Sequence, residues 1–229
     1  MIVLIPQGGI IRVFSFFPST GWYNIKSYEK IWNSRNYSDF SSYLKSINII
    51  KNLIIKAKNK LKINWKDVFF IGLSQGASLA LGVGIFSMLP IRGIFLFSGF
   101  IPYQNKIKTI LPGKIKIFIL NFIFRGRLDK IVPFEEGTKM FHFLEENSYK
   151  VKFFDYQNAG HYNIVSQSYR KAAELFKKNF TSKRRENYKI QLPFIRTKIT
   201  KTKDLVSFWL SSIIGSVISI PAFISFLLS

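Results

Sequence analysis

Residues 68–80 have the sequence Val-Phe-Phe-Ile-Gly-Leu-Ser-Gln-Gly-Ala-Ser-Leu-Ala, and the rest of the chain can be interpreted outward from them. Four apolar residues, 68–71, predict a short buried strand, and a stretch rich in small residues, 75–88, predicts a helix. Between them, the spacing Gly-x-Ser-x-Gly is typical of the sharp strand-to-helix turn that lifts a serine hydroxyl above the end of a parallel sheet. Ser74 is therefore the candidate nucleophile, with an ordinary turn serine as the alternative.

Short apolar runs and amphipathic stretches alternate along the first 180 residues. This alternation predicts an α/β fold, with a mainly parallel sheet and helices on both of its faces. A further apolar run, 1–5, opens the chain and ends at Pro6. The other predicted strands are 94–97, 115–124 and 151–156, and the other predicted helices are 39–62, 135–147 and 169–180.

An acid and a base follow the serine, in the order serine, acid, histidine that hydrolases with such a turn use. Asp129 lies in a loop directly after one predicted strand (115–124), and His161 lies just beyond the next. Because parallel strands end at the same edge of a sheet, the histidine can lean toward Ser74 while its other ring nitrogen meets the aspartate. The pattern thus predicts that Ser74, Asp129 and His161 form a catalytic triad. The alternatives are a helix cap or a partner of Arg127 for Asp129, and an ordinary loop histidine for His161.

The remaining titratable candidates fit surface roles better. His142 stands between two phenylalanines in a predicted helix and is expected on a helix face. The acidic pairs 135–136 and 145–146 stand at the two ends of that helix. They are expected to be solvated caps rather than a catalytic carboxylate pair.

Composition bounds the function classes. The chain has 229 residues, 48% of them hydrophobic, enough for one domain with a sizeable core. It has no cysteine and two histidines, which excludes a disulfide scaffold, a thiolate metal site, a cysteine nucleophile and a His-rich metal site. No metal-ligand cluster or Gly-rich phosphate loop appears in the sequence, so no cofactor is expected. The formal net charge is +22, but the cations are scattered rather than gathered in one stripe, so a specific nucleic-acid role is not expected.

The chain changes character after the first 180 residues, which are expected to form the catalytic domain. Residues 181–204 are basic and are expected to be a linker, whereas residues 205–229 contain no charged residue. As a helix, this last stretch would be roughly 37 Å long, enough to cross a hydrocarbon core of about 30 Å. We therefore predict a transmembrane tail anchor, against the alternative of a buried core helix. The basic flank, and a start without a signal peptide, predict that the domain lies on the cytoplasmic side of a membrane; the alternative is a soluble cytoplasmic protein.

Several stretches, spread over residues 1–178, resemble the phospholipase/carboxylesterase family of α/β-hydrolases, which includes the acyl-protein thioesterases. The matching stretches are Gly21–Ile25, Gly72–Ala80, Ser98–Pro102, Gly126–Pro133 and Gly160–His161. The resemblance implies an α/β-hydrolase fold in which Ser74 is the nucleophile, His161 the general base and Asp129 its orienting acid. It also implies that the backbone N–H of Gln75 is one oxyanion donor.

The chain departs from the family pattern in three places. Arg125-Gly126 stands where the family usually has His-Gly, and Trp22-Tyr23-Asn24 stands where it has Trp-Phe-Asp. The family's N-terminal strand, and the His-Gly loop that provides the second oxyanion donor, would lie upstream of Met1. Three alternatives follow: the chain starts late, Gly8-Gly9 supplies the donor instead, or catalysis is impaired. Missing strands would also leave an open sheet edge.

We therefore expect a serine hydrolase that cleaves carboxylic esters or thioesters through an acyl-enzyme on Ser74. Its substrate is expected to carry an apolar acyl chain, in a lipid or a lipidated protein, because the chain is rich in Phe and Ile and is predicted to be anchored. One alternative is a catalytically impaired, membrane-tethered hydrolase-like binding protein, because the second oxyanion loop is missing. Another is a basic peripheral protein that its cations hold to anionic lipid.

Overall fold

The computed structural model describes residues 2–4, 6, 9–13, 17–24, 39–102, 104, 106–107, 119–180 and 224–228. The strands are β1 (Ile2–Leu4), β2 (Gly9–Val13), β3 (Phe17–Gly21), β4 (Val68–Leu73), β5 (Gly93–Phe97), β6 (Leu120–Gly126), β7 (Lys150–Tyr156) and β8 (Ile224–Leu228). The helices are α1 (Phe40–Leu61), the short 3-10 helix η1 (Trp65–Asp67), α2 (Gln75–Phe86), α4 (Phe134–Glu146) and α5 (Ile164–Phe180).

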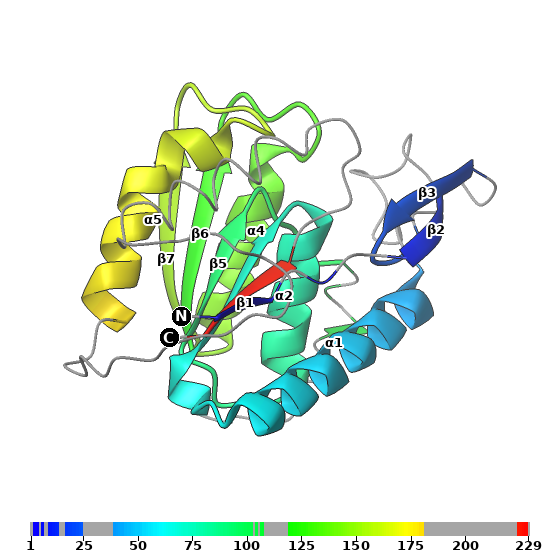
Figure 1. Ribbon diagram of the computed structural model, residues 1–229. Coiled ribbons are helices and arrows are strands. Elements are labelled where there is room, and N and C mark those ends of the chain that lie inside the picture. The colour runs from blue at the N-terminus through cyan, green and yellow to red at the C-terminus, as the bar shows by residue number, and fades with distance from the viewer. Residues whose placement is uncertain are drawn as a thin grey trace, which may run out of the picture.

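The sheet has six strands in the order β1–β8–β4–β5–β6–β7, and β2 and β3 form a separate hairpin (Figure 1). The four strands β4 to β7 are parallel neighbours, each joined to the next by a segment that contains a helix or a long connection. The predicted α/β fold is thus confirmed. The last helix begins at Ile164, earlier than the predicted 169, because Ile164 and Val165 belong to the buried face that packs on the sheet.

Two apolar layers cover the sheet on opposite faces. On one face, α2 and α4 pack against a continuous buried cluster that includes Phe70 and Ile123, and α1 lies outside α2. On the other face, α5 packs against a cluster that includes Phe69 and Phe124 (Figure 1). Because successive side chains of a strand point to opposite faces, neighbours such as Phe69 and Phe70 serve different layers.

Helix α2 is enclosed between the sheet and α1. Each of its residues from 75 to 85 is buried. A Cβ atom at Gly82 would lie 2.2 Å from the Tyr43 hydroxyl of α1, and one at Gly84 would lie 2.4 Å from Cδ1 of Ile94 in β5. The Tyr43 hydroxyl donates to the carbonyl oxygen of Ser78 at 2.9 Å. The small residues of α2 therefore allow two neighbours to approach it closely, which holds the turn at its N-terminus in place.

The hairpin of β2 and β3 was not predicted from the sequence. Its strands pair antiparallel, with Gly9 opposite Gly21. The next residue, Trp22, donates its N–H to Oε1 of Gln75 at the start of α2, at 2.9 Å. The base of the hairpin is thus attached beside the serine turn. Gly8, expected with Gly9 to replace an oxyanion donor, lies outside the described residues.

The prediction of a C-terminal membrane-spanning helix is wrong for the residues described there. Residues Ile224–Leu228 form β8, a strand that lies between β1 and β4 (red in Figure 1). It runs antiparallel to both neighbours, with Phe226 opposite Phe70 and Leu4. The reason is that a short apolar run satisfies its backbone in a sheet as well as in a helix, and periodicity does not separate the two. Residues 181–223, which include the predicted basic linker, lie outside the described part.

The expected open edge beside β4 is also absent, because β8 pairs along it. Strand β1 is antiparallel to β8 and therefore parallel to β4. Its carboxyl end thus points in the same direction as that of β4, which Ser74 follows. Among the helices that the structure describes, none is both long enough and apolar enough to cross a membrane.

Candidate active site

Ser74 occupies a strained turn between β4 and α2. Its backbone has φ 55° and ψ −122°, a conformation that residues with a side chain rarely adopt. A Cβ atom at Gly72 would lie 2.4 Å from the backbone of Gly76, so only glycine allows the chain to fold back this sharply. The Ser74 N–H donates to the carbonyl oxygen of Phe97 at 2.8 Å, which ties the turn to the end of β5. The turn predicted from the Gly-x-Ser-x-Gly spacing is present.

Gln75 lies next to Ser74, and its backbone N–H and its side chain have different surroundings. Its backbone N–H lies in the first turn of α2, where helix N–H groups have no intrahelical acceptor and can face an anion. Its buried side chain accepts from the Trp22 N–H and donates from Nε2 to the Tyr23 carbonyl oxygen at 2.6 Å. The side-chain role was not predicted. It connects the N-terminal segment to the serine turn across more than fifty residues of sequence.

Asp129 lies in the loop after β6 with a side chain closed off from solvent. Its Oδ1 accepts from the backbone N–H groups of Ile131 at 3.0 Å and Val132 at 2.8 Å. Burial raises the pKa of this carboxyl, but the hydrogen bond and charge of His161, the Val132 N–H and the Arg125 guanidinium outweigh it, and the pKa is lowered. Asp129 is therefore an anion near neutral pH.

His161 meets Asp129, as predicted. Nδ1 of the imidazole lies 2.9 Å from Oδ2 and 3.1 Å from Oδ1 of the carboxylate. Because a carboxylate can only accept, Nδ1 carries the hydrogen, which leaves Nε2 of the neutral ring as an acceptor. The alternative pairing of Asp129 with Arg127 is wrong, since Arg127 donates from Nε to Asp155 at 2.7 Å on the surface.

The loops that carry the acid and the base are pressed together. A Cβ atom at Gly126 would lie 2.1 Å from the carbonyl oxygen of Ala159, so the close approach requires glycine at this position. The N–H of Leu128 donates to the same carbonyl at 2.9 Å, and the N–H of Arg127 donates to Tyr156 at 3.0 Å. The Gly126 and Gly160-His161 motifs of the sequence therefore belong to one packed unit.

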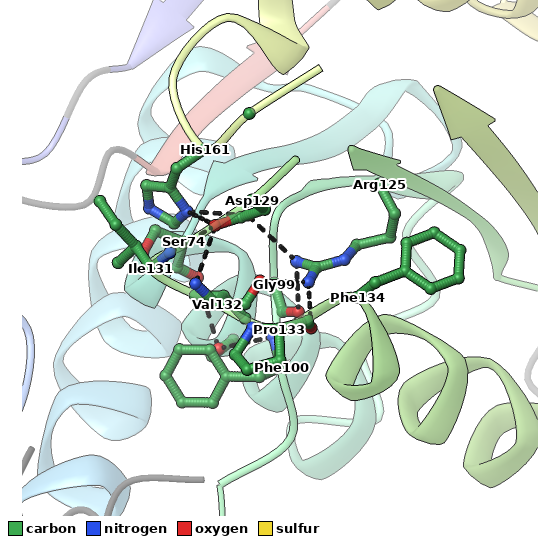
Figure 2. Close-up of polar contacts among 12 residues, drawn as sticks. Ser74, Gly99, Phe100, Arg125, Asp129, Ile131, Val132, Pro133, Phe134 and His161 are labelled. Atoms are coloured by element: carbon green, nitrogen blue, oxygen red, sulfur yellow. Dashed lines mark hydrogen bonds and ion pairs between the residues drawn. The ribbon is translucent and has the colours of Figure 1, made fainter. Parts of the chain in front are cut away.

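Ser74, Asp129 and His161 follow the carboxyl ends of β4, β6 and β7 and lie at the same edge of the sheet (Figure 2). The buried carboxylate orients the imidazole, and the ring nitrogen remote from it is available to accept a proton. A hydroxyl at this edge, held by a strained turn, is the type of group that such an imidazole activates.

The other titratable residues singled out from the sequence all lie on helix α4. His142 lies on α4 with a side chain 60% exposed, 3.8 Å from Glu145, as expected for a helix-face residue. The expectation that both acidic pairs are solvated is wrong for Glu136, which is buried and pairs with Lys139 at 2.6 Å. Within the part of the chain that the structure describes, no group of three acidic or histidine side chains could hold a metal ion.

The α/β-hydrolase class is defined by a mainly parallel sheet, a serine at a strand-to-helix turn, and a carboxylate–imidazole pair at the same edge of the sheet. Residues 7–180 match the sequence model of the phospholipase/carboxylesterase family, and the chain belongs to this family. The resemblance inferred from the motifs is thus confirmed.

Individual relatives agree with this assignment. The chain is similar to acyl-protein thioesterase 1 of Candida albicans, with 26% identity over 154 residues, 66% of this chain and 65% of the relative. It thus spans slightly less than two thirds of that relative. It is 29% identical over 98 residues to a probable inactive carboxylesterase of Oryza sativa, covering 43% of this chain and 40% of the relative. The crystal structure of SOBER1 from Arabidopsis thaliana has the same fold, with a TM-score of 0.65, 24% identity and coverage of 78% of this chain and 83% of that one.

Proposed function

We propose that this chain is a serine hydrolase that cleaves carboxylic esters or thioesters. The observation that carries the proposal is the buried Asp129–His161 pair, at the sheet edge where Ser74 stands in a positive-φ turn. Family membership and the similarity to an acyl-protein thioesterase support the same reaction class.

The reaction proceeds through an acyl-enzyme. The Ser74 Oγ attacks the acyl carbonyl carbon while Nε2 of His161 takes the hydroxyl proton, and the Gln75 N–H stabilises the oxyanion that forms. Collapse of this intermediate breaks the bond to the leaving alkoxide or thiolate, which receives the proton from His161. Water then attacks the acyl-enzyme with His161 again as base, and the carboxylic acid leaves with Ser74 restored.

We propose a substrate with an apolar acyl chain, in a lipid or a lipidated protein. Leu128 and Tyr162, which flank Asp129 and His161 in sequence, are 58% and 45% exposed. Apolar side chains at the border of the site favour an alkyl chain over a polar acyl group. Leu128→Asp is expected to lower kcat/KM for long-chain thioesters several-fold more than for acetyl thioesters.

Met88→Asp is the matched control for the substrate proposal. Met88 is 48% exposed but lies between the end of α2 and the start of β5, at the opposite edge of the sheet. Equal losses for short and long chains in Leu128→Asp, or the same selectivity loss in Met88→Asp, would contradict an acyl-binding role for this border.

Labelling with a fluorophosphonate tests the reaction itself. An activated serine displaces fluoride from phosphorus and keeps the phosphonyl group covalently. Ser74→Ala is expected to abolish labelling, and His161→Ala to slow it by about 1,000-fold or more. His142→Ala, which removes the exposed histidine of α4, is expected to label like the unaltered chain.

A second candidate is a catalytically impaired hydrolase-like protein that binds a partner. The similarity to a relative described as a probable inactive carboxylesterase favours it. It predicts that the folded, unaltered chain is not labelled at all. Ser74-dependent labelling would exclude it.

A further inference from the structure

Arg125 is a fully buried arginine in β6, the strand that leads to the Asp129–Pro133 loop, called the acid loop below. It lies near the end of β6, and its side chain has no exposed surface. Helix α4 leaves room for it: a Cβ atom at Gly137 would lie 2.5 Å from Cγ and Cδ of Arg125. Because a buried cation is costly unless it is compensated, the groups around this guanidinium are expected to have a specific arrangement.

The guanidinium and Asp129 hold the same loop from its two sides. Nη2 of Arg125 donates to the carbonyl oxygen of Val132 at 2.7 Å and also to that of Pro133. The N–H of Val132 donates in the other direction, to Asp129. Nη1 of Arg125 lies 3.7 Å from Oδ2 of Asp129, the oxygen that also faces His161 (Figure 2). The acid loop is therefore folded around an ion pair.

The same guanidinium also reaches toward the serine turn. Nη1 donates to the carbonyl oxygen of Gly99 at 3.4 Å, in the loop after β5. The next residue, Phe100, donates its N–H to Oγ of Ser78 at 3.3 Å, and that hydroxyl donates to the carbonyl oxygen of Ser74 at 3.4 Å. A continuous series of contacts thus joins the acid loop to the nucleophile turn.

The charges near Arg125 are few. Burial lowers the pKa of the Arg125 guanidinium, and the charges of Asp129 in the loop and of Glu136 and Glu135 in the first turn of α4 act in the opposite direction. His161 faces the group only through Asp129. No hydrogen-bond partner of Nε is found among the described residues.

We propose that Arg125 is a positioning residue of this site, which fixes the Asp129–Pro133 loop and, through Gly99, its placement relative to Ser74. The inference rests on the proposed function, because it assigns Asp129 to the orientation of His161. Arg125 touches no reacting atom. Its effect reaches catalysis through Asp129 and the loop.

The test compares the rate of fluorophosphonate labelling against pH in four chains: unaltered, Arg125→Met, Arg125→Lys and Arg127→Met. In Arg125→Met the labelling rate is expected to fall at least about tenfold, and the acidic limb of its pH profile is expected to move up by about one pH unit. The reason is that loss of a cation 3.7 Å from Asp129 makes protonation of the Asp129–His161 pair easier. Arg125→Lys keeps the charge, so its limb stays in place while the rate falls through the lost carbonyl contacts.

Arg127→Met is the matched control, because it removes an exposed guanidinium two residues away that pairs with Asp155. It is expected to keep both the rate and the pH profile of the unaltered chain. An Arg125→Met profile that coincides with the unaltered one would overturn the inference, because a merely structural arginine would not move the acidic limb.

A double-mutant cycle gives a readout that needs no activity. Urea unfolding of Arg125→Met, Asp129→Asn and the double variant is expected to be non-additive, with the double variant less destabilised than the sum of the single changes. If the unaltered chain is not labelled, the proposed function fails, and the cycle alone decides the inference: additive effects overturn it. If Arg125→Met does not fold, Arg125→Gln, which also removes the charge, takes its place in the pH profile and in the cycle.

Discussion

Single atoms decide the path of the backbone around Ser74. The turn has no room for a methyl group at Gly72, where the nearest neighbours are backbone atoms that cannot rotate away. The positive φ of Ser74 is a second strained feature of the same turn. The rest of the fold must therefore stabilise this conformation, and disturbance of it is expected to affect the whole domain.

Gly72→Ala is expected to lower the free energy of unfolding by about 3 kcal/mol or more, because the new Cβ would lie 2.4 Å from the backbone of Gly76. Gly160→Ala is the matched control, since the nearest atom to its added Cβ is 3.4 Å away. Urea unfolding measures both variants. Similar midpoints for the two would show that the steric account of the turn is incorrect.

The lowered pKa of Asp129 makes a stability prediction with a definite sign. Its folded-state pKa lies below the unfolded value of about 3.9, so the stabilisation is present above that value and is lost as pH falls through the folded pKa. Asp129→Asn has no ionisable carboxyl at this position and therefore lacks this pH-dependent stabilisation. The gap in unfolding free energy between the unaltered chain and Asp129→Asn is therefore expected to narrow as the pH falls below about 4. Urea unfolding across this range checks it, and a gap that widens on acidification would contradict the assignment.

At the scale of elements, helix α2 positions the serine turn because it is packed closely between β5 and α1. Gly82 and Gly84 lie on the two sides of the helix where Tyr43 and Ile94 approach. The hydrogen bond from the Tyr43 hydroxyl to Ser78 adds a polar contact in this apolar contact region, and Ser78 also contacts the Ser74 carbonyl. Helix α1 therefore supports the site without reaching it.

Tyr43→Phe is expected to lower the free energy of unfolding by about 1–2 kcal/mol, since it leaves a buried carbonyl without its hydroxyl donor at 2.9 Å. Tyr169→Phe, on a partly exposed tyrosine of α5, is the control and is expected to change little. Thermal or urea unfolding compares them. Equal stabilities would mean that the hydroxyl is not important for the packing of α1 on α2.

At the scale of the whole molecule, the first and the last described strands pair with each other in one sheet. Strand β8 from the C-terminus separates β1 from β4, and its backbone is paired on both sides. A strand with two neighbours contributes to the cohesion of the sheet, unlike an exposed tail. The C-terminal segment thus belongs to the structural unit that carries the serine turn.

Phe226→Pro is expected to lower the free energy of unfolding of the whole domain by about 3 kcal/mol or more, because proline removes a backbone donor from an interior strand. Phe226→Leu keeps the N–H and is the matched control, with a smaller loss. Cooperative urea unfolding measures both. A Phe226→Pro chain as stable as Phe226→Leu would show that β8 does not support the sheet.

The local pattern of the sequence was enough for most of the fold. Period and composition located β4, α2, β7 and, except for η1, the other elements described between residues 39 and 180, and the Gly-x-Ser-x-Gly spacing located the turn. The order serine, acid, histidine indicated that Asp129 and His161 would meet, because parallel strands bring their carboxyl ends to one edge. These features depend on residues close together in sequence, or on topology that follows from alternation.

Other features depended on contacts between distant residues. The segment at Ile224–Leu228 is apolar enough for a helix or a strand, and only the pairing available beside β4 made it a strand. The Gln75 side chain and the hairpin base meet across the chain, so neither had a local signal. Arg125 ends an otherwise apolar run, Phe122 to Phe124, and only the loop folded over it shows that its charge is buried against Asp129. Local sequence thus determined the elements and the chemistry-bearing residues, whereas tertiary structure decided which backbone groups and charges satisfy one another, because burial leaves a polar group dependent on whatever partner the fold brings to it.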